Sequence, residues 1–452
     1  MSIEDFKKTH RKWNLFQDID TLGSYDFFTS VVDLTSLSPR HILNMKSALE
    51  QLNHKKPKGE KLSHEQYSSL AKVLPLASHE YTHFIDATST LWGLRHLALL
   101  NNAYLADDKM GGTEEDFKSA KKFYDHTRSI HLPKYYTTIE LELPETRPWQ
   151  SVITMGKVFT SDGTTAGKPV LFSRFFNANG DCITRSPVST ISILEASAMA
   201  QEIFAQASLL DVAEDNFKTI ENNLHSKKVL SELYNKRLTE YSVCVHIVSN
   251  HLKCKEALTS FGICAVLTRL VLNMPKSCLE IIYRNCNIAK ILNIPARHEF
   301  ETRMSDGIKN GDLGIIFYLL CKALPQRPYN NHTTVMLGAV AALDKLGLNM
   351  DLIAEEGQIE AKSLFESLER SKIASIRLLA NAGIDNFKKQ EYKESRLDFQ
   401  KLSIPNALLD DLSFGEIFSS ENNILADLNM EDCYQELFSG QRWVERFAEA
   451  CL

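Results

Sequence analysis

The spacing of hydrophobic residues predicts two consecutive helices early in the chain. From Ser63 to Ala87 apolar residues recur at helical intervals. Ser63 and Gln66 have the spacing of a capping box, which predicts the start of the first helix. Pro75 suits the first turn of a second helix, because proline lacks the N–H that a first turn leaves unbonded. This second helix is expected to reach at least Ala87 and to resume after residues 88–90.

The middle of the chain has a different pattern, which predicts a small antiparallel sheet. In residues 139–143 apolar and acidic residues alternate, as in a half-buried strand. Two turn signals, Ser161-Asp162-Gly163 and Asn179-Gly180, separate apolar β-rich runs and predict hairpins. Strands are therefore expected over residues 139–143, 152–159, 170–176 and 182–184.

From Ile191 almost to the end the pattern is helical again. Prolines divide this region into segments, at Pro275, Pro295, Pro325 and Pro328. The last fifty residues are acidic but contain apolar residues and Trp443, which favours amphipathic helices packed on the body of the protein. The predicted fold class is α+β and mostly helical. The expected parts are an N-terminal segment (1–60), a core with the small antiparallel sheet (61–215) and an all-helical C-terminal domain (216–452).

Composition excludes several classes of protein. The chain has 452 residues, of which 44% are hydrophobic and 24% charged, as in ordinary globular proteins. A net charge of -6 argues against a nucleic-acid partner. Nine scattered cysteines without a C-x-x-C pair indicate free thiols in a reducing compartment. The sequence shows no signal peptide, and its longest apolar runs are too short to span a membrane, so we expect a cytoplasmic protein.

The segment His79-Glu80-Tyr81-Thr82-His83 predicts a metal site. On a helix, His79 and His83 lie one turn apart on one face, where both imidazoles can bind a single zinc ion. Glu80 follows the first histidine, so its carboxylate would stand beside the position left open for water. There it can act as general base and later return the proton to a leaving amine.

Four residues are candidates for the third metal ligand: Asp86, His96, Glu195 and Glu202. Asp86 is seven residues after His79, about 10.5 Å along the helix, which suits a hydrogen-bond acceptor for a ligand imidazole better than a ligand. His96 is farther still along the chain. Glu195 is followed by a run of small residues that would let its helix approach the first one closely, so we favour Glu195, with Glu202 as the alternative.

These residues carry a resemblance to a known family. The motif from His79 to His83, followed by Glu195 in a helix of small residues, resembles the gluzincin branch of the zincin-like metallopeptidases. The longer run His79-Glu80-Tyr81-Thr82-His83-Phe84 also resembles bacterial zincin-like proteins that pair such a helix with a later E-x-x-A helix. The resemblance covers residues 63–210 and implies a zincin-like catalytic core with zinc on His79, His83 and Glu195, and with Glu80 as base. The chain lacks the N-E-x-x-x-D form of the third-ligand helix, and its predicted sheet follows the metal helix instead of preceding it.

The sequence therefore predicts a zinc-dependent hydrolase, an endopeptidase that acts on a protein or peptide substrate, with a C-terminal domain that could bind a regulatory partner. Two alternatives stay open: a catalytically silent zincin-fold protein, and a helical interaction protein with an accidental motif. We expect residues 139–143 or 170–176 to border the substrate cleft. The donor that stabilises the oxyanion is left open among four residues: His131, Tyr135, Tyr136 and Arg185.

Overall fold

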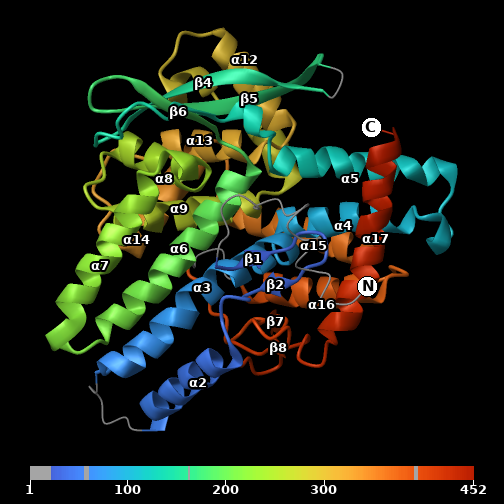
Figure 1. The fold of residues 1–452 in the computed structure, drawn as a ribbon. Coiled ribbons are helices and arrows are strands. Elements are labelled where there is room, and N and C mark those ends of the chain that lie inside the picture. Colours follow the sequence, from blue (N-terminus) through green and yellow to red (C-terminus); the bar gives the residue numbers. More distant parts are fainter. Residues whose placement is uncertain (1–21, 55–60, 161–162, 391–394, 452) are drawn as a thin grey trace.

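Two long helices lie side by side at the centre of the computed structural model, which describes residues 22–54, 61–160, 163–390 and 395–451 (Figure 1). They are α3 (His64–Thr88) and α6 (Thr190–Asp211), and they make the closest helix pair in the fold. From Ala77 onward every residue of α3 is buried, because other elements pack around it on all sides. This pair is the frame to which the rest of the chain is attached.

The start of α3 is confirmed, but its expected division at Pro75 is wrong. Ser63 and Gln66 form the predicted capping box. The helix then continues through Pro75, although proline cannot donate a hydrogen bond to the carbonyl of Ala71. Packing of the buried face against α6 outweighs this local cost. The predicted interruption lies at the other end, where Thr90 caps α4 (Leu91–Leu105).

The predicted antiparallel sheet is present, in the order β3-β6-β5-β4. Its strands are β3 (Thr138–Ile139), β4 (Gln150–Phe159), β5 (Thr165–Phe176) and β6 (Cys182–Pro187). The Asn179-Gly180 turn is confirmed, with Gly180 at a φ of 88°. The other predicted turn lies partly outside the described residues, at 161–162. The sheet leads directly into α6, since β6 ends three residues before that helix begins.

The strand expected over residues 139–143 is wrong beyond Ile139. After β3 the chain turns around the ammonium group of Lys236, which lies in a short 3-10 helix (Lys236–Leu238). Lys236 Nζ donates hydrogen bonds to the carbonyls of Glu140, Leu141 and Leu143 at 2.9, 3.0 and 3.1 Å. These contacts from a distant segment override the alternating pattern.

A second sheet joins the two ends of the chain, and the sequence pattern did not predict it. Its strands are β1 (Ser24–Tyr25), β2 (Val32–Asp33), β7 (Ala407–Leu408) and β8 (Phe414–Gly415), in that order. The β2 and β7 strands pair in parallel and the other neighbours are antiparallel. Strands of two residues are too short to show alternation. The C-terminal part is therefore not all helical, and of its last fifty residues only α17 (Met430–Cys451) is a helix.

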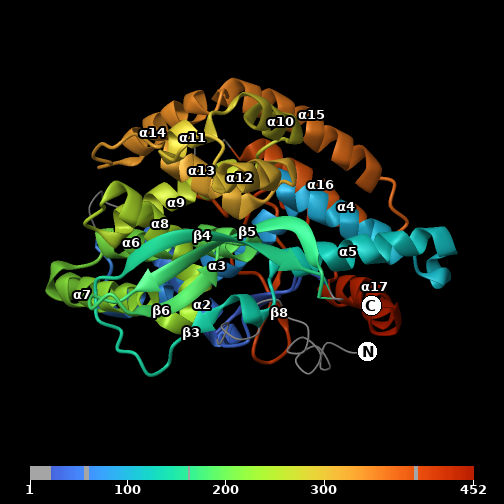
Figure 2. The ribbon, with the colours of Figure 1, turned by 90° about the horizontal axis from the view of Figure 1, so that it is seen from above.

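The remaining helices surround the central pair. Figure 2 shows α10 to α15 as an arc along one side of the molecule. The helices not yet bounded are α2 (Pro39–His54), α5 (Phe117–Ile130), α7 (Asp215–Leu233), α8 (Thr239–Leu252), α9 (Ala257–Leu272), α10 (Lys276–Asn285), α11 (Ile288–Leu292), α12 (Glu299–Lys309), α13 (Leu313–Ala323), α14 (His332–Lys345), α15 (Met350–Leu368) and α16 (Ala374–Lys389). Three further 3-10 turns cover Asp108–Met110, Glu114–Asp116 and Lys134–Tyr136.

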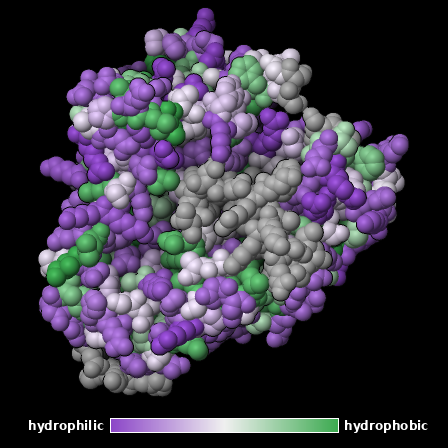
Figure 3. All heavy atoms as spheres, in the orientation of Figure 1, coloured by the Kyte–Doolittle hydropathy of each residue, from purple (hydrophilic) through white to green (hydrophobic). Residues whose placement is uncertain are grey.

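The hydrophobic core runs through all three parts expected from the sequence. One cluster of buried side chains includes Leu34, Leu70 and Leu379, and the β2–β7 pair also connects the N- and C-terminal parts. The boundaries at residues 60 and 215 thus remain predictions. The face in Figure 3 is largely hydrophilic, with apolar residues in small patches. Among the described residues, no single helix is long and apolar enough to span a membrane; α9 and α10 meet that criterion only as a pair bent by 103°.

The contact between α16 and the end of α3 generates a first prediction. A Cβ on Gly383 of α16 would lie 2.2 Å from the carbonyl oxygen of Thr88, a backbone atom that cannot move aside. We expect Gly383→Ala to lower the free energy of unfolding by about 1–3 kcal/mol, measured by denaturant unfolding. Gly262→Ala in α9 is the matched control, because a Cβ there meets nothing within 4 Å. That control should be neutral or stabilising, and equal losses in both variants would contradict the argument.

Candidate metal centre

The histidines of α3 meet a glutamate of α6 inside the protein. His79 Nε2 and His83 Nε2 are 3.3 Å apart, as expected for imidazoles one helical turn apart. Glu195 Oε2 lies 3.4 Å from His79 Nε2, and Glu195 Oε1 lies 3.4 Å from His83 Nε2. The side chain of Glu195 is fully buried. The predicted convergence of these three residues is present in the structure.

Small residues of α6 allow this approach. Ala196, Ala198 and Ala200 are completely buried in the helix that carries Glu195. Side chains of this size bring the two helix backbones close enough for a short carboxylate to reach the imidazoles. The small-residue pattern in the sequence thus correctly indicated where the second helix comes nearest to α3.

The group of three has the chemistry of a metal site. One ligand-type atom from each of His79, His83 and Glu195 lies within 4.8 Å of the other two. Neither buried carboxylate oxygen of Glu195 accepts a hydrogen bond within the described part of the chain. A buried carboxylate held only by two imidazoles at 3.4 Å fits an intervening cation. Two imidazoles and one carboxylate are a donor set that zinc accepts, with a further position for water.

The pKa shifts of His79 and Glu195 agree with the binding of a cation. Burial alone would lower the pKa of His79, but Glu195 and Glu202 outweigh it and raise that pKa well above its usual value. Burial would raise the pKa of Glu195, but His83 and His79 outweigh it and the pKa is lowered. Glu195 and Glu202 therefore stabilise a positive charge beside them, either as a proton on His79 or as a bound metal ion. Metal binding would release the proton from His79.

Glu202, the alternative third ligand, contacts the opposite side of His79. Its Oε2 lies 3.1 Å from His79 Nδ1, while Nε2 of the same ring faces Glu195. Lys228 Nζ lies 3.3 Å from Glu202 Oε1. A carboxylate at the distal ring nitrogen orients the imidazole and makes it more basic toward a metal. Glu202 therefore has the contact with a histidine of this group that the sequence analysis had expected of Asp86.

Asp86 and His96 make other contacts. Asp86 Oδ1 lies 2.7 Å from Arg269 Nη1 in a buried ion pair. Its role as acceptor for a ligand imidazole stays a prediction. His96 lies between His126 Nε2, 3.1 Å from its Nδ1, and the carbonyl of Phe27, 3.1 Å from its Nε2. Burial lowers the pKa of His96 to about 4, so it is a neutral core histidine away from the metal group.

Glu80 lies beside a cavity of about 230 Å³ next to the metal group. Its polar side includes His79, Glu80 and Glu202. Its apolar side is formed by Leu22, Leu76, Met199, Leu233, Leu238 and the ring of Tyr241. A Cβ on Gly23 would lie 3.0 Å from Glu80 Oε1, so a glycine lets the chain before β1 pass directly over this carboxylate. The general base expected from the sequence therefore faces a space next to the metal group.

The segments expected to border the cleft do not line this cavity. Neither residues 139–143 nor residues 170–176 contribute to it. Lys228 and Tyr241 do, from α7 and α8. No sequence signal assigned either residue to the site; the Lys228–Glu232 spacing indicates only a helical ion pair.

The four oxyanion candidates also lie away from the cavity. His131 Nε2 is 3.3 Å from Glu240 Oε2. Tyr136 accepts a hydrogen bond from the Phe159 N–H, and the Arg185 guanidinium stacks over Phe172. None of the four, including Tyr135, lines the cavity. Tyr241, with its hydroxyl-bearing ring at the cavity wall, is the tyrosine that this part of the structure brings near Glu80.

Comparison with protein-family models, curated proteins and solved structures gives no match for this chain.

The convergence of three donors predicts the metal content of the purified protein. We expect about one zinc per chain, because the donor set fits one ion, and we expect His83→Ala to remove most of it. Elemental analysis after dialysis measures the content. His64→Ala is the matched control, since His64 is an exposed histidine at the start of the same helix. Full zinc occupancy in the His83 variant would disprove the assignment.

The contact between Glu202 and His79 predicts a smaller effect. Glu202→Gln should keep the metal but weaken its binding about 10–100-fold, because the imidazole loses its negatively charged partner. Competition with a chromophoric chelator measures the affinity. Glu195→Gln, which alters a direct ligand, should lose more than Glu202→Gln. An unchanged affinity in Glu202→Gln would show that this contact does not support the site.

Proposed function

We propose that the chain is a zinc-dependent hydrolase, and that it acts as an endopeptidase of the zincin type. The observation that supports this best is the burial of His79, His83 and Glu195 around one point, with Glu80 facing a cavity beside it. Burying two imidazoles and two carboxylates is costly unless each group has a partner. A catalytic metal ion would be bound by His79, His83 and Glu195, and Glu80 would act as the base beside it.

Each residue of the site would have its own chemical role. His79, His83 and Glu195 would hold the ion, which when bound supplies Lewis acidity that activates water and polarises a substrate carbonyl. Glu80 would take the proton from the attacking water at its carboxylate and deliver it to the leaving amine. Glu202 would keep the ring of His79 oriented during turnover. The buried surroundings strengthen each of these charge interactions.

The shape around the site favours an extended peptide as substrate. The cavity of about 230 Å³ has the size of a single side chain, and its apolar wall suits a hydrophobic one. We therefore place one hydrophobic side chain of an extended substrate in the cavity, next to the metal group and Glu80.

A catalytically silent zincin-fold protein is the second candidate. In that case the metal group would serve structure or binding alone. Glu80 counts against it, because a silent protein has no use for a buried carboxylate next to the metal group. An accidental motif fits less well still, since Glu195 comes from a helix distant in sequence. The eight cysteines whose side chains the structure describes are free thiols, in keeping with a reducing compartment such as the cytoplasm.

The proposed role of Glu80 predicts a separation of binding from catalysis. Glu80→Gln should keep the zinc and the fold but lose hydrolysis by at least about a hundredfold, because water then lacks its base. Turnover of a substrate peptide and zinc content are measured on the same preparation. Glu65→Gln, an exposed glutamate in the first turn of α3, is the control and should retain activity. Wild-type activity in Glu80→Gln would exclude the proposed mechanism.

A substrate can be found by comparing protein termini in cells that express the wild type or Glu80→Gln. New termini that depend on Glu80 would support an endopeptidase and identify the scissile bond. If the protein carries zinc but produces no such termini and hydrolyses no peptide, the silent alternative replaces the proposal.

A further inference from the structure

A second cavity, of about 260 Å³, is lined by Arg269, which forms an ion pair with Asp86 of α3. Its walls come from the end of α9, the end of α16 and the segment that follows α16 after the gap at 391–394. Four of its residues are basic and one is acidic, which sets it apart from the cavity at Glu80. The basic residues are Arg269, Lys389, Arg396 and Lys401, and the acidic one is Asp398.

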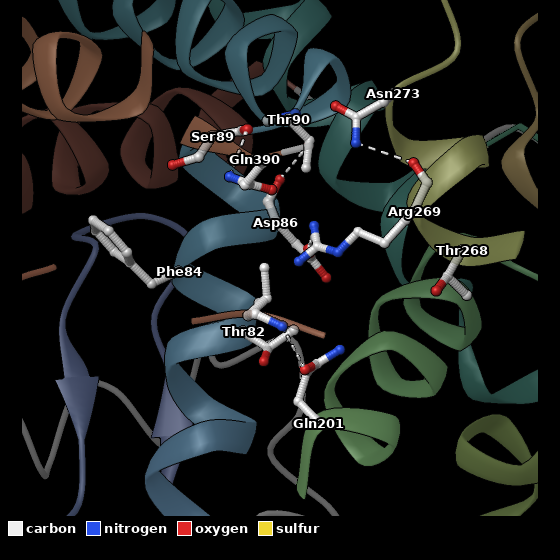
Figure 4. Close-up of polar contacts among 12 residues, drawn as sticks. Thr82, Phe84, Asp86, Ser89, Thr90, Gln201, Thr268, Arg269, Asn273 and Gln390 are labelled. Atoms are coloured by element: carbon white, nitrogen blue, oxygen red, sulfur yellow. Dashed lines mark hydrogen bonds and ion pairs between the residues drawn. The ribbon is translucent and has the colours of Figure 1, made fainter. Parts of the chain in front are cut away.

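The contacts of Arg269 indicate that the cavity holds a ligand. Its side chain is only 7% exposed, and Nη1 lies 2.7 Å from Asp86 Oδ1. Nε and Nη2 of the same guanidinium have no hydrogen-bond partner among the described residues. Figure 4 shows Arg269 reaching from α9 toward Asp86 on α3, with Asn273 and Gln390 nearby. Unsatisfied N–H groups on a buried cation are costly and rare, so a partner in the adjoining cavity is expected.

Two further cations of the cavity already have carboxylate partners. Lys389 pairs with Asp385 at 2.6 Å and Lys401 with Asp398 at 2.9 Å. Both pairs are solvent-accessible pairs within one segment, which hold their partners weakly. Arg396 is exposed and makes no hydrogen bond or ion pair within the described part of the chain. Among the described residues, Asp86, Asp385 and Asp398 balance three of the four cations, which leaves one positive charge.

We propose that this cavity binds a phosphate group. Guanidinium N–H groups form a planar fork that matches the oxygens of phosphate, and ammonium groups add charge around it. The cavity is large enough for a phosphate and a small attached group, and too small for a large ligand. Arg269 would hold the innermost oxygens, and Arg396 and Lys401 would close over the outer ones. The site stands on its own contacts and does not depend on the proposed hydrolase activity.

The test is a calorimetric titration of the full-length protein with inorganic phosphate, against sodium chloride at matched ionic strength. Because phosphate can also bind zinc, the titration is repeated on protein treated with a chelator. We expect saturable binding of phosphate that persists after treatment with the chelator. Arg396→Gln and Lys401→Gln should each weaken it about tenfold, the loss of one charged hydrogen bond. Lys122→Gln, an exposed lysine of α5 outside the cavity, is the control and should bind as the wild type does.

Glycerol phosphate, titrated in the same way, distinguishes the two sources of the group. Tighter binding of the ester assigns the site to a phosphorylated small molecule, and tighter binding of inorganic phosphate assigns it to the free ion. Both variants avoid Arg269, whose loss would leave Asp86 buried without its cation and could unfold the protein. The proposal is overturned if neither compound binds, if the chelator abolishes binding, or if the two variants bind as tightly as the wild type.

Discussion

The close contact between α3 and α6 is the constraint on which the rest of the structure depends. It brings a carboxylate of α6 to 3.4 Å from two imidazoles of α3 in the interior of the protein. Only small side chains at the interface permit this distance, and α6 supplies them around Glu195. The contact also explains why α3 tolerates Pro75: a helix held along its length by a neighbour does not need every hydrogen bond of its own.

Titratable side chains are buried along α3, and helices around it provide side chains of opposite charge. His79, Glu80, His83 and Asp86 all lie on this helix and are all buried. Their counterparts come from distant parts of the chain: Glu195 and Glu202 from α6, and Arg269 from α9. An unpaired ion in such a place would cost several kcal/mol, so each charge restricts where its partner can be. The fold around α3 is in this sense organised by electrostatics as much as by hydrophobic packing.

The parts that the sequence predicted are those in which local pattern and tertiary packing agree. The capping box at Ser63, the strands of the antiparallel sheet and the convergence of His79, His83 and Glu195 each rest on spacing within one segment, or on side-chain size at one interface. The errors arise where a distant contact decides the structure. Lys236 draws the carbonyls after Ile139 into a turn, and β1 and β2 exist only because β7 and β8 complete their sheet. Glu202 was a candidate ligand, but the structure places it at Nδ1 of His79. That contact depends on how α3 and α6 are rotated relative to each other, and this rotation cannot be read from a single sequence.

The first cavity is lined by residues of α3, and the second is connected to the same helix by the ion pair between Arg269 and Asp86. Asp86 is three residues after His83, so the ion pair that fixes Arg269 begins within one helical turn of His83. Any group that competes with Asp86 for Arg269 changes the charge that α3 carries at that turn. Charge near a buried imidazole alters its basicity, and basicity governs how strongly it binds a metal ion. Since ligand effects between two sites are reciprocal, metal at His83 would in turn change the affinity of the second cavity. The short distance along α3 between Asp86 and His83 is what would make such coupling direct, because no movement of separate domains is needed to carry it.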